Sequence, residues 1–277
     1  MMRMPTIAAA MAAMLLSSAT CAQDAPAPSD AALEAAVKDP GRSPRMVERD
    51  AARHPLEALA FFGLKPSSTV VEIWPAGGYW TEILAPYLHA AGTYYAALET
   101  TESDSPDREA AEKRNAYFTH RLAEDPGRYG RVKLTRMGPG RDTIAPAGSV
   151  DLILSFRDLH VWMKQGFAEQ ALVDCYTALK PGGILAMEDH RGHRAGQQDL
   201  KAGDGYVRED YAKGLAELAG FVFVASSEIE SNPKDLANWP KGVWTLPPTL
   251  ALGKEDRDRY TAIGEPDNFV LTFKKPE

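Results

Sequence analysis

Residues 156–160 (FRDLH) place a guanidinium, a carboxylate and an imidazole close together in the chain. An imidazole can take up or release a proton near neutral pH, and a guanidinium can hold a carboxylate or a phosphate. We therefore expect His160 to act as a general base and Arg157 to hold the anionic part of a substrate. In the alternative interpretation, Arg157 pairs with Asp158 and His160 caps a helix.

Residues 188–193 (EDHRGH) form a second group of the same kind. We expect His190 to face a substrate and exchange protons with it, because the neighbouring carboxylate of Asp189 can orient the imidazole. Asp189, His190 and His193 could instead ligate a metal ion for a metal-assisted hydrolase, since zinc and iron bind such side chains. Two histidines on a loop share no fixed face and Arg191 repels a cation, so we predict no metal site.

Residues 70–78 (VVEIWPAGG) have the pattern of a strand, a tight turn and the start of a helix. Because glycine lacks a Cβ atom, such a turn can approach a ligand closely, and the helix N-terminus offers free N–H groups. Glu99, about 20 residues further on, stands where an acidic residue accepts hydrogen bonds from ribose hydroxyls. We expect Glu72, Gly78 and Glu99 to line one nucleoside-sized pocket. The alternative is an ordinary strand-to-helix turn with a surface glutamate.

The elements that must position these groups alternate between strand and helix patterns. Runs of β-branched residues predict strands, and apolar residues at helical spacing predict helices. The expected strands are 69–74, 93–98, 131–137, 150–156, 184–188, 221–229 and 269–274. The expected helices are 31–62, with interruptions at 40, 41 and 44, then 79–91, 103–124, 167–179 and 206–219, with a turn at 180–183.

This alternation predicts one doubly wound α/β domain over 31–277 with a mostly parallel, seven-stranded sheet and an N-terminal helical extension. An antiparallel strand pair should close one edge of the sheet. Because the carboxyl ends of parallel strands meet at one edge, His160 and His190 should lie on the same rim and face the same crevice. The Trp/Pro-rich residues 232–264 should cover this crevice, since long irregular segments in compact domains are usually functional.

Residues 1–22 have the pattern of a secretory signal peptide. A basic residue precedes an apolar run at 7–16 and then small residues, and this run is too short to span a bilayer, which takes about 20 residues. We predict cleavage between Ala22 and Gln23, export to the periplasm and no membrane-spanning segment after cleavage. A lipoprotein acylated at Cys21 is the alternative.

The composition excludes several classes of protein. With 277 residues, of which 44% are hydrophobic and 25% charged, the chain has the proportions of a globular protein. Its net charge of −7 offers no basic surface for nucleic acid, so a small-molecule substrate is the expected partner. The Pro/Ala segment 23–30 is expected to be a linker. If Cys21 leaves with the signal peptide, Cys175 is the single thiol, and its apolar helical neighbours predict a buried structural cysteine.

Residues 70–78 also resemble the S-adenosylmethionine motif of class I methyltransferases, in which an acidic residue precedes GxGxG. Residues 148–154 (GSVDLIL) resemble the fourth-strand motif of these enzymes, and 179–185 (LKPGGIL) resemble the turn before their fifth strand. In these enzymes an acidic residue after the third strand meets the adenine, and here the nearest carboxylate to that place is Asp142. The resemblance implies that S-adenosylmethionine is bound by Glu72, Ala76, Gly77, Gly78, Glu99 and Asp142.

A further set of motifs resembles a family of exported bacterial proteins classed as predicted methyltransferases. The motifs begin near Arg42 and comprise Arg49-Asp50, Arg53-His54-Pro55, Phe61-Phe62-Gly63, Leu84-Ala85-Pro86-Tyr87-Leu88, Asp189-His190-Arg191, Ala219-Gly220-Phe221 and Leu246-Pro247-Pro248-Thr249. This resemblance implies transfer of a methyl group from S-adenosylmethionine to a small-molecule acceptor. His190 or His160 would remove a proton from that acceptor.

The glycine motif is degenerate, because Trp74 and Ala76 stand where two of the three glycines are expected and only Gly78 is kept. An exported, non-catalytic protein that binds a small ligand and retains the methyltransferase fold is the alternative function. A pocket that is open between this turn and Glu99 favours the enzyme. A Trp74 side chain that fills this space favours the binding protein.

Overall fold

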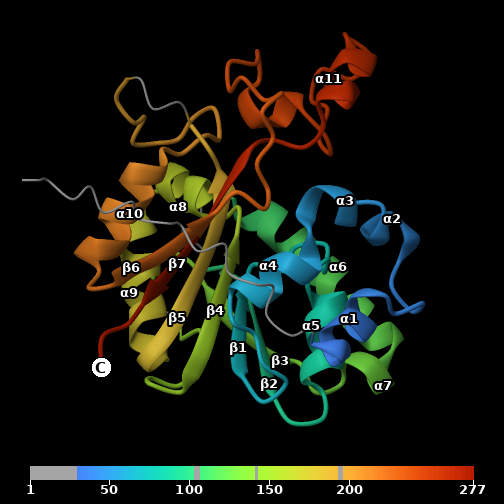
Figure 1. Cartoon of the computed structure of the whole chain (residues 1–277), viewed down its shortest axis with the longest axis vertical. Coiled ribbons are helices and arrows are strands. Elements are labelled where there is room, and N and C mark those ends of the chain that lie inside the picture. The colour runs from blue at the N-terminus through green and yellow to red at the C-terminus, as the bar shows by residue number, and fades with distance from the viewer. Residues whose placement is uncertain (1–29, 103–106, 141–142, 193–195) are drawn as a thin grey trace, which may run out of the picture.

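A seven-stranded sheet runs through the residues that the computed structural model describes, which are 30–102, 107–140, 143–192 and 196–277 (Figure 1). The strand order across the sheet is β3-β2-β1-β4-β5-β7-β6. The strands are β1 (Thr69–Ile73), β2 (Thr93–Glu99), β3 (Lys133–Met137), β4 (Val150–Phe156), β5 (Leu179–His190), β6 (Val222–Ser227) and β7 (Asn268–Lys274).

All neighbouring strands are parallel except at β7, which runs antiparallel to both β5 and β6. The chain progresses outward from β1 to β3 and resumes at β4 on the other side of β1, so the strand order reverses between β1 and β4. Open α/β sheets bind ligands outside the carboxyl ends of their strands at such a reversal. The predicted seven-stranded, mostly parallel, doubly wound sheet is confirmed.

Helices cover both faces of this sheet (Figure 1). One face packs against α1 (Ala31–Val37), α4 (Pro55–Phe61), α5 (Thr81–Leu88) and α6 (Arg108–Glu124). The other face packs against α8 (Leu159–Gln165), α9 (Ala168–Ala178) and α10 (Glu209–Leu218). Shorter helices are α2 (Pro44–Val47), α3 (Asp50–Arg53) and α7 (Pro126–Tyr129).

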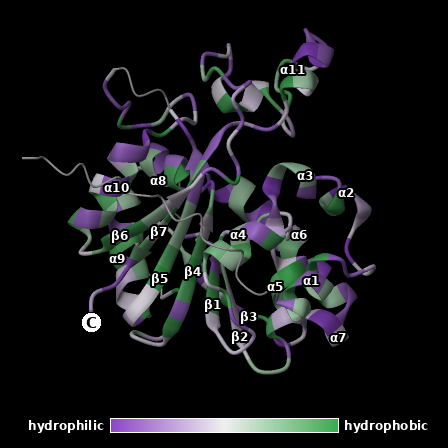
Figure 2. Cartoon of the chain, viewed as in Figure 1, coloured by the Kyte–Doolittle hydropathy of each residue, from purple (hydrophilic) through white to green (hydrophobic). Residues whose placement is uncertain are grey.

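Buried side chains of the strands alternate between the two faces, as the pleat of a strand requires. In the central strands, Val71 and Ile153 pack with the α8–α10 side, whereas Val70 and Leu152 pack with the α1–α5 side. Because both faces are buried, these strands are nearly continuous hydrophobic runs, which the hydropathy colouring makes visible (Figure 2). Cys175 of α9 is fully buried in this core, and burial raises the pKa of its thiol, as expected of a structural cysteine.

Among the differences from the sequence prediction, two concern β5 and the helix that follows β4. β5 begins at Leu179, because residues 180–183, which were expected to form a turn, belong to the strand. The pairing of β5 with β4 shifts register opposite the start of β4. Helix α8, which follows β4 closely, has no counterpart among the expected helices. Its sequence signal is the helical spacing of three apolar side chains that are all buried, Leu159, Trp162 and Met163.

The cover segment, residues 232–264, contains the 3-10 turn η1 (Gly242–Thr245) and helix α11 (Arg257–Ile263). It lies beyond the carboxyl ends of the strands, at the top of Figure 1. Within the described ranges, none of the helices has both the length and the apolar character that crossing a membrane demands. The expected signal peptide and linker, apart from Asp30, together with Asp142 and His193, lie outside the described residues.

Candidate functional site

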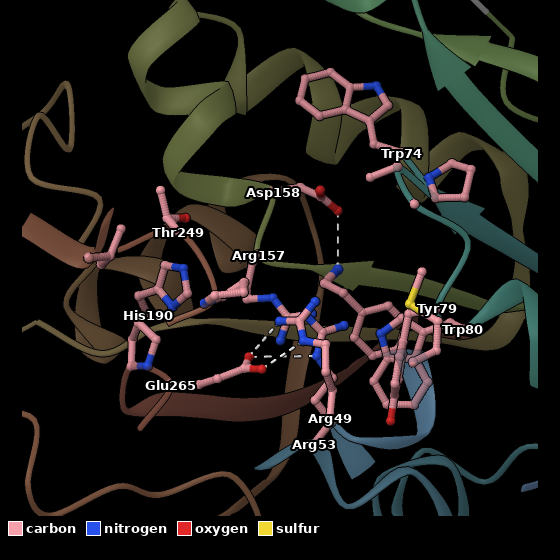
Figure 3. Close-up of a pocket in the computed structure, with 18 of the residues that line it drawn as sticks. Arg49, Arg53, Trp74, Tyr79, Trp80, Arg157, Asp158, His190, Thr249 and Glu265 are labelled. Carbon is pink, nitrogen blue, oxygen red and sulfur yellow. Dashed lines mark hydrogen bonds and ion pairs between the residues drawn. The ribbon is translucent and has the colours of Figure 1, made fainter. Parts of the chain in front are cut away.

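A pocket of about 580 Å³ opens at the carboxyl ends of β1, β4 and β5, where the strand order reverses (Figure 3). Its walls come from the β1–α5 turn, the residues after β4 and β5, the N-terminal helices and the cover segment. The candidate residues that line it are Glu72, Ala76, Gly77, Arg157, His160 and His190. Gly78 and Glu99 do not line it, so the prediction that they share one pocket with Glu72 is wrong for both.

The β1–α5 turn holds two residues in a conformation that usually needs glycine. Trp74 has a φ of 43° and Ala76 a φ of 47°, both in the left-handed region. That region costs a residue with a Cβ atom about 1–2 kcal/mol, so surrounding contacts must hold the turn in place. The turn therefore keeps left-handed angles at the two positions where glycines are replaced.

The side chain of Trp74 fills the space between this turn and the end of β3. Its backbone N–H donates to the carbonyl of Ala97 in β2 at 2.9 Å, and its Nε1–H donates to the carbonyl of Met137, the last residue of β3, at 3.0 Å. The indole packs edge-on against Trp162 and at a tilt against Phe167, with 6.2 and 5.9 Å between ring centroids. The ring thus extends from β1 across the end of β2.

Glu99 and Gly78 are both engaged with α6 instead of the pocket. Both carboxylate oxygens of Glu99 accept hydrogen bonds from the guanidinium of Arg114, and its backbone carbonyl accepts one from Asn115 Nδ2 at 2.8 Å. A bidentate charged pair is among the stronger hydrogen-bonded contacts in proteins. Gly78 packs so closely on α6 that a Cβ atom there would lie 3.2 Å from the guanidinium of Arg121. Neither residue is available to a ligand in the pocket.

Glu72 is only 2% exposed, yet it contributes to the pocket wall. The hydroxyls of Thr81 and Tyr94 donate to its Oε2 atom, and no described residue donates to Oε1. Burial raises the pKa of Glu72 to about 7, although the two hydroxyl donors oppose the rise. The group is therefore partly protonated at neutral pH.

His160, in the first turn of α8, is held by Asp189 near the end of β5. Nδ1 of His160 lies 2.8 Å from Oδ1 of the Asp189 carboxylate, which also accepts the backbone N–H groups of His160 and His190 at 2.9 and 2.7 Å. Burial opposes ionisation of Asp189, but the His160 ring and these donors outweigh it and keep its pKa below the usual value. Since an ionised carboxylate can only accept, Nδ1 of His160 carries a proton and Nε2 is left without a partner among the described residues.

His190 is buried beside His160, with 5.2 Å between the ring centroids. Its Nδ1 donates to Oδ1 of Asn268 at 2.7 Å, so its Nε2 also has no partner in the described part of the chain. Burial, together with the nearby His160 and Arg157 charges, lowers the pKa of His190 to about 3. The ring is therefore neutral at physiological pH and offers a lone pair to a ligand.

The prediction that His160 and His190 face the same crevice is confirmed. The prediction that Asp189 orients His190 is wrong, because the Asp189 side chain holds His160 and Asn268 holds His190. Of the two rings, His160 has the arrangement of a general base.

Arg157 directs its buried guanidinium at acidic side chains from other elements. It pairs with Glu188 of β5 and lies 3.8 Å from Glu230, which follows β6. Asp158 accepts hydrogen bonds from Ser155 Oγ and from a backbone N–H, both at 3.1 Å. The alternative in which Arg157 pairs with Asp158 is therefore not the arrangement found, and Arg157 is largely neutralised within the protein.

Arginines of the N-terminal helices also line the pocket, and sequence reasoning gave them no role. Arg49 makes a bidentate pair with Glu265, with both N···O distances 2.7 Å. Figure 3 shows Arg49, Arg53 and Arg157 gathered beside Glu265. The sequence signal is the spacing of Arg45, Arg49 and Arg53, four positions apart, which would place them on one side of a continuous helix.

Arg53 is a buried cation of this group with little compensation. Its side chain lies over the ring of Tyr79 at 4.5 Å and approaches Glu265 at 3.7 Å, but no described residue accepts a hydrogen bond from it. It is 6% exposed, and burial together with the charges of Arg157 and Arg49 lowers its pKa to about 9. A buried guanidinium without acceptors at a pocket wall is a site for an anion.

Trp244, Pro247, Pro248 and Thr249 of the cover segment line the pocket as well. The Trp244 ring lies 6.2 Å from the ring of His160. The cover segment thus brings an aromatic side chain to the candidate base.

His160, Asp189 and His190 are also close enough to share a metal ion, because one ligand atom of each lies within 4.8 Å of the others. The Asp189 oxygens, however, already accept three N–H groups. His193, the remaining ligand of the metal alternative, is outside the described residues. The contacts therefore favour a hydrogen-bonded group over a metal centre.

No protein-family model matches this sequence, and no curated protein matches it. Solved structures do share its fold. A SAM-dependent methyltransferase from Aquifex aeolicus has a TM-score of 0.54 at 15% identity, with 82% of this chain and 93% of that chain covered. The [4+2]-cyclase SpnF has a TM-score of 0.54 at 16% identity, with 82% and 81% covered. A protein assigned as a sarcosine dimethylglycine methyltransferase from Galdieria sulphuraria has a TM-score of 0.52 at 14% identity, with 84% and 86% covered.

These likenesses establish the class I methyltransferase fold for this chain. Two of the three solved proteins are named as methyltransferases and one as a cyclase, so the fold carries more than one reaction. The reaction therefore depends on the residues of the pocket.

Proposed function

We propose that this chain is an enzyme that acts on a small organic anion in the central pocket, with His160 as the general base. The observation that carries this proposal is the hydrogen bond between His160 and Asp189, which fixes the tautomer of a ring whose Nε2 is unpartnered in the described structure. An imidazole oriented by a buried carboxylate is an arrangement that general bases use. Asp189 is a positioning residue in this scheme.

The remaining wall residues fit an anionic substrate. The guanidinium of Arg53 has no hydrogen-bond acceptor among the described residues and only a 3.7 Å contact with Glu265, and Arg45 and Arg49 stand on the same wall. His190, which is neutral, can accept a hydrogen bond from a hydroxyl or amino group of the substrate. A volume of about 580 Å³ suits a small molecule.

Deuterium exchange tests the proposal across a panel of candidate acids. Small carboxylic and phosphorylated acids are incubated with the protein in D₂O, and proton NMR follows the loss of exchangeable C–H signals. We expect exchange into at least one acid, slower by about 10²-fold or more in His160→Gln. The matched control is His120→Gln, whose side chain is 75% exposed, and it should exchange at the wild-type rate. Equal rates in both variants would remove His160 as the base.

The same experiment separates the enzyme from a non-catalytic binding protein. The Trp74 ring fills the space beside the β1–α5 turn, which is the arrangement expected of a binding protein. Such a protein needs Arg53 for an anion, but it has no use for an oriented imidazole. Anion binding that is lost in Arg53→Gln, with no exchange into any acid by the wild type, would favour the binding protein.

Methyl transfer from S-adenosylmethionine to a small-molecule acceptor is a second candidate, favoured by the fold shared with named methyltransferases. The pocket lies at the strand-order reversal, and Glu72, Ala76 and Gly77 line it. The other described residues of the expected cofactor set do not fit, because neither Gly78 nor Glu99 lines the pocket. We therefore derive no step through this cofactor.

A further inference from the structure

The ends of β2 and β3 are where the nucleoside of a cofactor would have to lie. In open α/β sheets with nucleoside ligands, an acidic residue at the end of the second strand accepts the ribose hydroxyls. In this chain those strand ends are Glu99 and Met137, and neither lines the pocket. The pocket extends over β1, β4 and β5 and stops at β1 on its other side.

Trp74 forms the wall at which the pocket stops. The residue lines the pocket, and its indole reaches beyond β1 to the carbonyl of Met137. For a nucleoside to enter, the ring would have to leave, which gives up the Nε1 hydrogen bond and the contacts with Trp162 and Phe167. Together these three interactions favour the closed arrangement by at least about tenfold.

The Arg114–Glu99 pair closes the same region from the side of α6. Ribose hydroxyls would have to displace a guanidinium that holds both carboxylate oxygens. A neutral hydroxyl is a weaker donor than a guanidinium, so this exchange is unfavourable.

Charge also separates the two kinds of ligand. S-adenosylmethionine carries a sulfonium cation in addition to its amino-acid group. The pocket wall presents four guanidinium groups and the carboxyl groups of Glu72, Asp158 and Glu265, and the guanidinium groups of Arg49 and Arg157 are paired within the protein. The buried guanidinium of Arg53 has no hydrogen-bond acceptor among the described residues and only a 3.7 Å contact with Glu265. Arg53 would repel a sulfonium placed beside it, whereas a carboxylate or phosphate there would compensate its charge.

We propose that Trp74 is a specificity-determining residue that excludes nucleoside ligands, S-adenosylmethionine included, so that the pocket takes a small carboxylate- or phosphate-bearing molecule on the β4–β5 side of β1. This inference rests on the proposed function only in that it takes this pocket as the substrate site. The left-handed backbone of Trp74 agrees with it, since strain of this kind persists where surrounding contacts fix a side chain.

Isothermal titration of the purified chain tests the proposal, with S-adenosylmethionine, S-adenosylhomocysteine, citrate and inorganic phosphate as probes. The wild type should bind citrate or phosphate, and Arg53→Gln should bind that anion at least about tenfold more weakly. At about 1 mM, the wild type should bind neither S-adenosylmethionine nor S-adenosylhomocysteine. The two anions distinguish a carboxylate site from a phosphate site. The double variant Trp74→Gly/Arg114→Ala should gain binding of a nucleoside probe, whereas Trp74→Phe, which keeps an aromatic ring, should not.

Wild-type binding of S-adenosylmethionine with a Kd below about 1 mM would overturn the proposal. A folded double variant that still binds neither nucleoside would overturn the role of Trp74. If the double variant does not fold, proton NMR of the wild type tests the role of Trp74. The indole N–H resonance of Trp74 is assigned by its loss in Trp74→Phe. We expect that resonance to stay in place when S-adenosylmethionine is added, and a shift on addition would contradict us. Failure of the proposed function would appear separately, as an absence of deuterium exchange.

Discussion

The imidazoles of His160 and His190 lie 5.2 Å apart although one belongs to a helix and the other to a strand. Each ring is fixed through Nδ1, His160 by the carboxylate of Asp189 and His190 by the amide oxygen of Asn268. The two rings are not equivalent, because His160 is held by an ionised carboxylate and His190 by a neutral amide, and burial lowers the pKa of His190 to about 3. The pair combines a base with a hydrogen-bond acceptor that stays uncharged.

Replacing His190 with Gln should make the protein less sensitive to acid. The pKa of His190 falls from 6.5 to about 3 on folding, so below pH 6.5 the unfolded chain binds a proton that the folded chain does not. This contribution to stability is present above pH 6.5 and is lost progressively as the pH falls toward about 3. Between pH 6.5 and about 5 the loss is about 2 kcal/mol.

Urea unfolding at about pH 7.5 and about pH 5 measures this difference. His190→Gln should lose about 2 kcal/mol less than the wild type between these two conditions. His120→Gln, at an exposed position of α6, is the matched control and should behave as the wild type does. An undiminished acid sensitivity in His190→Gln would show that His190 is not held neutral.

Replacing Glu72 with Gln should change the pH dependence of stability in the opposite direction. Burial raises the pKa of Glu72 from 4.5 to about 7, so its contribution is fully present below pH 4.5 and is lost as the pH rises through about 7. Gln keeps an oxygen that Thr81 and Tyr94 can donate to, but it has no proton to lose. The stability change between pH 4.5 and about 8 should therefore be smaller by about 3 kcal/mol in Glu72→Gln.

Chemical denaturation at the two pH values measures this change. Glu57→Gln, at an exposed position of α4, controls for the loss of a surface carboxylate. If Glu72→Gln and Glu57→Gln follow the wild-type pH profile equally, Glu72 is ionised in the folded protein at neutral pH.

Replacing Glu265 with Gln should loosen the cover segment. The bidentate pair with Arg49 and the contact with Arg53 attach the region after the cover segment to α3. Hydrogen bonds to charged groups contribute about 1.5–3 kcal/mol, so the free energy of unfolding measured with urea should fall by that amount. Limited proteolysis should also cut residues 232–264 faster in this variant.

The matched control for this prediction is Glu255→Gln, because Glu255 is exposed within the cover segment. It should leave both the urea midpoint and the proteolysis rate unchanged. Equal proteolysis of Glu265→Gln and the wild type would mean that the ion pair does not hold the segment.

Export of this chain is a prediction from its N-terminal residues. In a bacterial host the protein should be recovered from the periplasm with Gln23 as its first residue, because small residues precede this position after an apolar run. Intact-mass spectrometry of periplasmic and membrane fractions measures this. A chain that begins at acylated Cys21 would establish a lipoprotein, and an intact Met1 in the cytoplasm would exclude both.

The sheet could be predicted because its strands are local patterns. Val150–Phe156 is a mostly apolar run, interrupted by Asp151 and Ser155, and the structure gives β4 the expected bounds. The meeting of His160 and His190 followed from the same patterns, since each lies at the carboxyl end of a parallel strand or just past it. Such placement depends on topology alone and not on the contacts of individual side chains.

Partners of individual side chains could not be predicted in the same way. The pairing of Glu99 with Arg114 depends on how α6 is placed beside β2, and the course of the Trp74 ring depends on Trp162 and Phe167, far along the chain. Arg53 enters the pocket only because the N-terminal helices pack over the end of the sheet. These contacts are tertiary, and no local pattern encodes them.

The antiparallel strand β7 lies between β5 and β6, and Glu265, just before it, pairs with Arg49, 216 positions earlier. A ribosome or a translocation channel that delivers the chain from its N-terminus must therefore release nearly all of it before the sheet can close. Until then β5 and β6 present unpaired edges, which are templates for aggregation. A premature stop after residue 264 would thus remove an inner strand and not a dispensable tail.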